Sequence, residues 1–310
     1  MKNNWSKNFA NKYIKKYKKL GFSKDLALRV YTTHLLGRNK ELVLHGGGNT
    51  SVKTTIKDID GKKYSVLCVK GSGWDMADIE PEGLPAVKLE PLLGLKKKKY
   101  LSDEDMVNFQ KKNLINIKSP NPSVETFLHA FLPFKYVDHT HADAVLAITN
   151  TPGGKNKIKE IYGPDILIIP YVMPGFVLAK KIAELTENIN WKELRGMILL
   201  NHGVFSFGDT AKKSYDRMLN IVNAAELYLK SKRSWNPYAK SNSNPDLLSI
   251  SKIRKLASSM TGSAVISKVN FSSEAAGFSS NPDAVSLSLR GTLTPDHVIR
   301  TKPFAWIIGK

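Results

Sequence analysis

Apolar residues recur at helical spacing in the first 20 positions of the chain. Trp5, Tyr13 and Tyr17 fall on one face of a helix that repeats every 3.6 residues, which predicts an amphipathic N-terminal helix. Ser102, followed three residues later by Asp105, resembles a capping box and predicts a helix start. Further helices are expected over residues 24–36, 102–113, 123–131, 210–232 and 246–260.

Short apolar runs of strand length lie between these helices. They predict strands over residues 42–44, 64–69, 136–141, 166–169, 197–200 and 264–269. Strands mixed with helices, without a regular 30-residue βαβ rhythm, favour an α+β domain or a three-layer αβα domain. Residues 231–245 are rich in Ser, Asn, Pro and Lys and predict a linker or domain edge. We therefore expect a main domain over 1–235 and a C-terminal extension or linker over 236–310.

Composition places the chain among ordinary globular proteins and changes the picture in two respects. Of its 310 residues, 42% are hydrophobic and one is a cysteine, Cys68, so an internal disulfide is excluded and a reducing compartment is favoured. No apolar run approaches the roughly 20 residues needed to cross a bilayer, and the N-terminus has no apolar signal region. We expect a soluble cytoplasmic protein without membrane contact, with Cys68 in the core rather than acting as a nucleophile.

The chain is strongly basic. Lys and Arg number 47 against 27 acidic residues, a net charge of +20, which favours anionic partners such as phosphorylated substrates. Only 8 of the cations are arginine, the residue on which specific base recognition depends most, and the lysines are scattered apart from residues 96–99. We therefore expect a general basic surface and no nucleic-acid ligand.

Three histidines and one glutamate are candidates for metal chemistry. His139 and His141 are two residues apart on a predicted strand, so their side chains point to the same face. His202 follows an apolar strand and precedes a glycine, and a third histidine would leave an open coordination position, as in catalytic zinc sites. Glu125 heads the predicted helix in front of the pair. It is either a helix-capping acid or a general base beside a metal.

Two glycine-rich turns follow predicted strands, at residues 45–51 and 70–73. Consecutive glycines let backbone N–H groups point into one anion-binding concavity, to which Asn49, Ser51 and Ser72 would add donors. Neither turn has the G-x-x-x-x-G-K-[ST] spacing and no G-x-G-x-x-G occurs, which argues against a nucleotide-binding loop. Ordinary turns and a phosphate site both remain open on this pattern alone.

Five segments in order resemble the class II aldolase/adducin family over roughly residues 25–235. They are HGGGNTSVK (45–53), VKGSG (69–73), PSVETFLHA (122–130), DHTHADAV (138–145) and LLNHGVFSFG (199–208). The residues of these segments, together with RGTLTPDHVIRTKPF (290–304), are most similar to the aldolase half of the bifunctional rhamnulose-1-phosphate aldolase/alcohol dehydrogenase type. A short-chain dehydrogenase domain follows in that type, so the resemblance implies a separate or missing dehydrogenase.

The resemblance implies an α/β fold, a three-layer αβα sandwich of the class II aldolase type, assembled as a homotetramer. It implies Zn²⁺, or another divalent metal, bound by His139, His141 and His202, with Glu125 as acid/base. It also implies phosphate binding at Gly48, Asn49, Ser72, Gly73 and Ser123. Val124 stands where such aldolases often have a second serine, so an unphosphorylated substrate stays open. It also implies a proton-donor tyrosine from a neighbouring subunit.

The implied reaction is zinc-dependent retro-aldol cleavage of a ketose 1-phosphate, similar to rhamnulose-1-phosphate, to dihydroxyacetone phosphate and a short aldehyde. A sugar-phosphate epimerase or dehydratase of the same family is an alternative, as is a non-catalytic adducin-like interaction module. Acids should orient the imidazoles, because metal-bound histidines usually donate their second N–H to such a group. Asp138 and Asp143 are the candidates, although solvated charges would fit both equally well.

Overall fold

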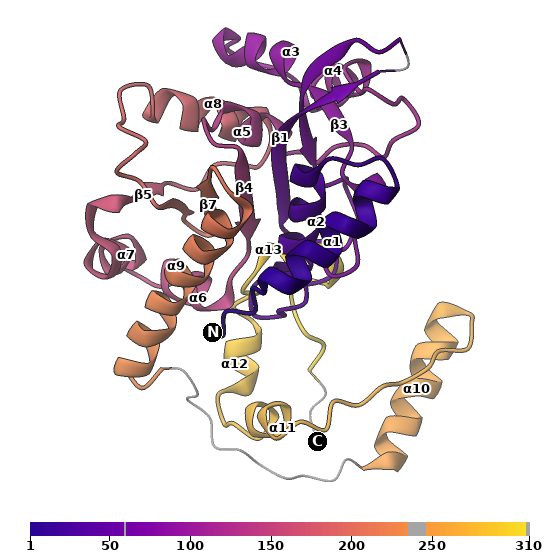
Figure 1. Cartoon of the computed structure of the whole chain (residues 1–310). Helices are drawn as coiled ribbons and strands as arrows, with labels where there is room; N and C mark the ends of the chain where they lie inside the picture. Colours follow the sequence, from indigo (N-terminus) through magenta and orange to yellow (C-terminus); the bar gives the residue numbers. More distant parts are fainter. Residues whose placement is uncertain (59, 235–245, 308–310) are drawn as a thin grey trace. The chain divides into compact units, whose positions relative to one another are not determined.

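A computed structural model describes residues 1–58, 60–234 and 246–307 (Figure 1). The described chain forms two compact units, Met1–Tyr228 with Leu293–Lys302, and Leu229–Thr292 with Pro303–Lys310. The predicted linker lies mostly outside the described residues, because 235–245 are not among them. The division of the chain at residue 235 stays a prediction.

The first unit is built on a seven-stranded sheet with the strand order β3-β2-β1-β4-β7-β6-β5. All neighbouring strands pair antiparallel except β5 and β6, which are parallel. The strands are β1 (Asn49–Lys57), β2 (Lys63–Val69), β3 (Ala86–Lys88), β4 (Tyr136–Thr140), β5 (Ile166–Ile169), β6 (Gly196–Leu199) and β7 (Gly203–Gly208). The central strand β4 is buried along its whole length.

Helices surround this sheet, and the regular structure of the described part of the second unit is helical. Ser23 and Ser102 cap α2 and α4 by accepting the backbone N–H of Leu26 and Asp105, which ties two helix starts to their local sequence. The helices of the first unit are α1 (Lys7–Lys19), α2 (Lys24–Gly37), α3 (Leu89–Gly94), α4 (Asp103–Lys112), α5 (Thr126–Phe131), α6 (Asp143–Thr149), α7 (Gly154–Tyr162), α8 (Phe176–Leu185) and α13 (Pro295–Arg300). The long helix α9 (Ala211–Ser231) ends in the second unit, which also holds α10 (Leu247–Thr261), α11 (Ser273–Ser279) and α12 (Ala284–Ser288).

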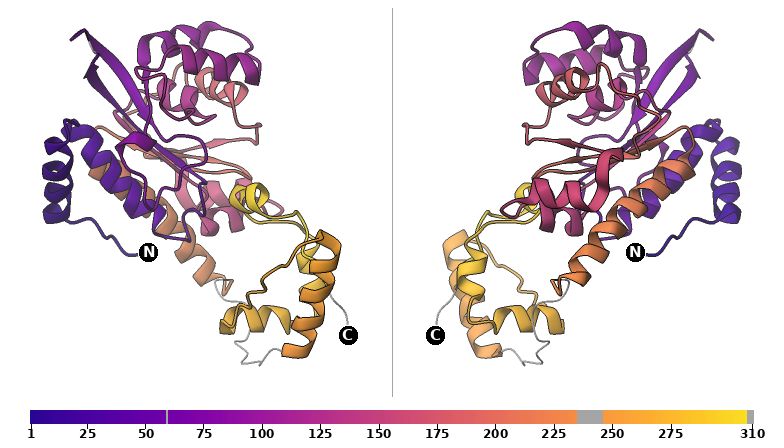
Figure 2. Two further views of the ribbon diagram at one scale, coloured as in Figure 1. Left: turned by 90° about the vertical axis from the view of Figure 1, so that its right-hand side faces the viewer. Right: turned by 90° about the vertical axis from the view of Figure 1, so that its left-hand side faces the viewer.

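Two hydrophobic cores lie on opposite faces of the sheet. Along β2, Leu67 and Val69 pack into the core formed with α3, α4, α5 and α8, whereas Val66 and Cys68 pack into the core formed with α1 and α2. This alternation follows from the period of two along a strand. Figure 2 shows the indigo helices α1 and α2 on the other side of the sheet from the magenta helices α4 and α5. The predicted three-layer αβα architecture is confirmed.

Most predicted elements are present, and two predicted strands are wrong. Residues 42–44 form no strand; they come at the end of the turn after α2, and the strand begins only at Asn49, beyond the glycine cluster. Residues 264–269 form no strand, because no neighbouring strand pairs with them; Ile266 is 97% exposed. The helix expected over 123–131 begins at Thr126, so Glu125 immediately precedes it. None of the helices in the described ranges is both long and apolar enough to cross a bilayer.

Candidate active site

The three candidate histidines meet at the end of β4. His139 lies on β4, His141 follows that strand directly, and His202 lies in the turn between β6 and β7. All three are buried, and one ring nitrogen of each lies within 4.8 Å of the others. Because β4 and β7 are adjacent, the imidazole of His139 also stacks on Phe205, with ring centroids 4.1 Å apart. The antiparallel pairing thus brings residues 61 positions apart to one point.

Hydrogen bonds to the outer nitrogens orient two of these imidazoles. Nδ1 of His139 lies 3.1 Å from the carbonyl oxygen of Val204, and Nδ1 of His141 lies 2.5 Å from a carboxylate oxygen of Asp296. Since a carbonyl and a carboxylate accept hydrogen bonds, both Nδ1 atoms donate. The two Nε2 atoms then face each other at 3.0 Å with lone pairs and no proton between them. This arrangement fits a cation between the rings.

Glu125 closes the site from the start of α5. Its Oε2 accepts a hydrogen bond of 2.7 Å from the Asn49 amide and lies 3.4 Å from Nε2 of His139, while Oε1 lies 3.5 Å from Nε2 of His202. Oε1 of Glu125 is buried without a hydrogen-bond partner among the described residues and faces Nε2 of His202. An unpartnered carboxylate oxygen beside three imidazole nitrogens is a donor set that fits a divalent metal.

Electrostatics keep the Glu125 carboxylate charged and the imidazoles of His139 and His202 neutral. Burial raises the pKa of Glu125, but attraction to His139 and His202 in their protonated forms and the hydrogen bond from Asn49 outweigh it and lower that pKa to about 2. Burial lowers the pKa of His139 well below its usual value despite the attraction of Glu125. Burial likewise lowers the pKa of His202. Neutral imidazoles have the free lone pair that a metal ligand needs.

A buried histidine that the sequence patterns did not single out holds Asn49 in place. Nε2 of His129 donates to the Asn49 side-chain oxygen at 2.5 Å, and its Nδ1 pairs with the Ser51 hydroxyl at 2.8 Å. The Asn49 amide nitrogen in turn reaches Glu125 and, at 3.1 Å, the Ser123 hydroxyl. His129 follows Glu125 by four residues across one turn of α5, and that spacing was the available signal.

The two glycine-rich turns lie side by side next to Ser123. The Lys70 ammonium donates to the carbonyl oxygens of Gly46 at 2.9 Å and Trp74 at 2.7 Å, which joins the turns. The N–H of Ser123 donates to the Lys70 carbonyl, and that of Ser72 to Asn121. Gly48 and Gly73 have φ values of 57° and 80°, the left-handed region that favours glycine. A role in phosphate binding for Gly48, Asn49, Ser72, Gly73 and Ser123 stays a prediction.

The acids expected to orient the imidazoles were chosen wrongly. Asp138 alternates with His139 along β4, so it points to the opposite face of the sheet and pairs with the buried Arg29. Asp143 makes no hydrogen bond to an imidazole in the described chain. The carboxylate that does so is Asp296 on α13, 155 residues beyond His141. Local sequence spacing could not reveal a contact over that separation.

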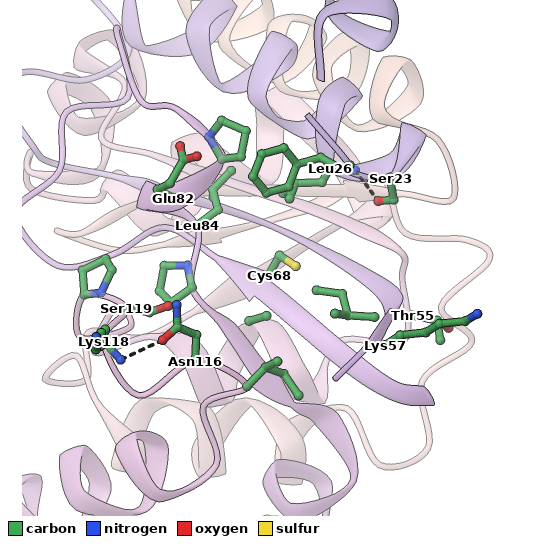
Figure 3. Close-up of a pocket in the computed structure, with 18 of the residues that line it drawn as sticks. Ser23, Leu26, Thr55, Lys57, Cys68, Glu82, Leu84, Asn116, Lys118 and Ser119 are labelled. Carbon is green, nitrogen blue, oxygen red and sulfur yellow. Dashed lines mark hydrogen bonds between the residues drawn. The ribbon is translucent and has the colours of Figure 1, made fainter. Parts of the chain in front are cut away.

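A cavity of about 890 Å³ lies apart from the histidines, between the start of α2 and β2 (Figure 3). Its lining includes Ser23, Leu26, Cys68 and Leu84, and none of the candidate site residues. Burial and the nearby Asp25 raise the pKa of the Cys68 thiol to about 12. At neutral pH this thiol stays protonated, which agrees with its expected place in the core and gives no reactive nucleophile.

Gly203 is a point where a single methyl group would disturb the site. A Cβ there would lie 2.4 Å from the carbonyl oxygen of Thr140 and 2.9 Å from Cε1 of His139. We expect Gly203→Ala to lower the free energy of unfolding by about 1–3 kcal/mol, as overpacking does. Chemical denaturation checks this, with Gly94→Ala as the control, since that glycine has open space around its Cβ position. Equal stabilities of the two variants would contradict the expectation.

Comparison with known proteins places the chain in a family. The family model described as "Class II Aldolase and Adducin N-terminal domain" matches residues 28–229, and the model "Aldolase class II, second domain" matches residues 246–310. The Bacillus subtilis (strain 168) protein "Uncharacterized oxidoreductase YuxG" is 35% identical over 282 residues, which is 88% of this chain. The chain spans 40% of the length of that relative.

A solved structure agrees with this assignment. The N-terminal class II aldolase domain of a conserved protein from Thermoplasma acidophilum is 42% identical, with a TM-score of 0.64. The match covers 74% of this chain and 99% of that one. With the seven-stranded sheet between two helical layers and a family model spanning residues 28–229, the chain belongs to the class II aldolase and adducin family.

Proposed function

We propose that this protein is a metal-dependent aldolase, a carbon–carbon lyase, that cleaves a ketose 1-phosphate similar to rhamnulose-1-phosphate. The products would be dihydroxyacetone phosphate and a short aldehyde. The observation that carries the proposal is the convergence of three buried imidazoles and the Glu125 carboxylate. The Nε2 atoms of His139 and His141 lie 3.0 Å apart. A non-catalytic interaction module has no need for four such groups at one buried point.

His139, His141 and His202 would hold Zn²⁺ or another divalent metal. Three neutral ligands leave the ion its full charge and an open position. When bound, the ion supplies Lewis-acid stabilisation of negative charge on the substrate's ketone oxygen. The protein's own contribution is to hold the rings in register, through the Val204 carbonyl for His139 and the Asp296 carboxylate for His141.

Glu125 would handle the proton at the carbon that becomes nucleophilic. In cleavage the C3–C4 bond breaks, the C4 hydroxyl gives its proton to water as C4 becomes the aldehyde, and the electron pair stays on the three-carbon fragment. The Glu125 carboxylate takes up a proton from water and delivers it to C3, and in the reverse direction it removes that proton from C3. Its unpartnered Oε1 is the oxygen available to reach substrate.

The substrate phosphate would bind at the joined glycine turns, through Gly48, Asn49, Ser72, Gly73 and Ser123. Asn49 and Ser123 already bond to each other, and Asn49 also bonds to Glu125. An anion bound at the turns would therefore influence Glu125 through the hydrogen bonds of Asn49. The net charge of +20 favours capture of an anionic substrate.

Assembly and location belong to the same proposal. We propose a cytoplasmic homotetramer that works with a short-chain dehydrogenase, either as a separate protein or as a further domain. A relative named an oxidoreductase, of which this chain spans 40%, supports the dehydrogenase partner. A domain over 1–235 followed by an extension over 236–310 is part of this proposal.

Metal analysis combined with an aldehyde-release assay tests the proposal. Purified full-length protein should contain roughly one zinc ion per chain and release aldehyde from rhamnulose-1-phosphate or fuculose-1-phosphate. Zinc without aldehyde release would keep the metal site, contradict cleavage of these two sugar phosphates and favour an epimerase, a dehydratase or another sugar substrate. A protein that takes up no divalent metal after reconstitution would contradict the metal site and favour the interaction module.

A further inference from the structure

A short segment near the end of the chain reaches the histidine cluster. The helix α13 belongs to the same compact unit as the sheet, although about 60 intervening residues belong to the other unit. Asp296 on α13 is 3% exposed. Its Oδ1 accepts the hydrogen bond from Nδ1 of His141 at 2.5 Å, and its Oδ2 accepts the backbone N–H of Leu44 at 2.7 Å. Both carboxylate oxygens are therefore engaged.

We propose that Asp296 is a positioning residue of the metal site, which fixes the tautomer and ring orientation of His141. This inference rests on the proposed function, since it assigns Asp296 a role toward the metal that the three histidines would hold. A carboxylate on Nδ1 keeps the proton there and leaves the Nε2 lone pair pointing into the site. His139 is oriented in the same way by the Val204 carbonyl, which has no formal charge.

The surroundings of Asp296 are shaped to admit its carboxylate. A Cβ at Gly47 would lie 1.6 Å from Oδ1 and 2.4 Å from Cγ of Asp296, so any other residue at position 47 would displace the carboxylate. The backbone at Gly47 is not in the left-handed region, which means that the need for glycine there comes from the side chain of Asp296. Two segments 249 residues apart in the sequence are thus matched to each other.

Further contacts hold the α13 segment against the rest of the first unit. Nε of Arg300 donates to the carbonyl oxygen of His45 at 2.9 Å, and the Asn150 amide donates to the carbonyl oxygen of Leu293 at 3.0 Å. Thr294, 2% exposed, precedes α13 and pairs with the His297 ring at 2.7 Å. Asp296 and Arg300 accept from and donate to the backbone of Leu44 and His45, respectively, and Asp296 also bonds to His141. The segment therefore connects the first glycine turn to the histidines at the end of β4.

The zinc affinity of the full chain tests this role. Asp296→Asn keeps the size of the side chain and removes its charge, and competition with a chromophoric chelator should show zinc binding about 10–100-fold weaker. Gly47→Ala should weaken zinc binding similarly, because its methyl group occupies the place of the carboxylate. Asp143→Asn is the matched control. The charge of Asp296 contributes to the raised pKa of Asp143, so the two carboxylates are close, but Asp143 makes no hydrogen bond to an imidazole in the described chain. This control should leave the affinity unchanged.

A readout on the metal-free protein separates this inference from the proposed function. The ¹⁵N chemical shifts of His141, assigned by comparison with His141→Gln, should report a proton on Nδ1 in the unsubstituted chain and a mixture of tautomers in Asp296→Asn. A proton on Nε2 in the unsubstituted chain would overturn the inference without any variant. Zinc affinity and tautomer both unchanged in a folded Asp296→Asn would overturn it while the aldolase proposal stands. A chain that binds no zinc would overturn the aldolase proposal, and the tautomer would then decide whether Asp296 orients His141.

Discussion

Replacing Glu125 by glutamine should lower kcat for aldehyde release by about 10²–10⁴-fold, the usual contribution of a positioned acid/base group. The amide has nearly the shape of the carboxylate and can still accept the hydrogen bond from Asn49. It cannot take up or deliver the proton at the carbon that becomes nucleophilic. The three imidazoles that would bind the metal are unchanged, so zinc content should stay at the level of the unsubstituted chain.

Steady-state kinetics and elemental analysis on the same preparation check both halves of this expectation. Glu187→Gln makes the same chemical change at an exposed position and should leave kcat as it was. Turnover that survives in Glu125→Gln would remove this residue from the acid/base role. A loss of zinc together with turnover would instead point to Glu125 as a group that holds the metal.

Replacing Arg29 by methionine should lower the free energy of unfolding by about 3–5 kcal/mol, because it leaves a buried acid without its partner. Arg29 and Asp138 form an ion pair in which both side chains are fully buried. Arg29 also donates to the carbonyl oxygens of Ser51 and Val137, so it links α2 to β1 and β4. Burial raises the pKa of Asp138, although attraction to Arg29 and the hydrogen bond from the Ser214 hydroxyl oppose this rise. Without Arg29, the Ser214 hydroxyl would be left to stabilise the buried carboxylate.

Denaturant titration with a double-variant cycle checks the origin of this loss. Arg29→Met combined with Asp138→Leu removes both charges and should recover part of the stability, since an uncharged pair carries no desolvation penalty. Arg195→Met is the matched control, because its pair with Asp165 is about half exposed and should cost less than about 1 kcal/mol. A loss in Arg29→Met no larger than in this control would contradict the expectation.

Local patterns in the sequence predicted the elements whose signals are contained within a few residues. The amphipathic stripe of the first helix and the cap at Ser102 are present as expected. Where an element depends on a distant partner, the patterns were insufficient. Residues 264–269 have an apolar run but no neighbouring strand, whereas β7 (Gly203–Gly208) forms because β4 and β6 pair with it on either side.

The sequence by itself determined the fold class, the family resemblance and the set of ligand-type residues, because motifs of five to ten residues carry them. Only the tertiary structure decided which groups act on those residues. Strand alternation places the Asp138 side chain on the opposite face of the sheet from the imidazoles. His129 on α5 makes a hydrogen bond to Asn49 on β1. Asp296 reached His141 from 155 residues away. Hydrogen bonds of this kind depend on separations of about 3 Å in space, which sequence distance does not encode.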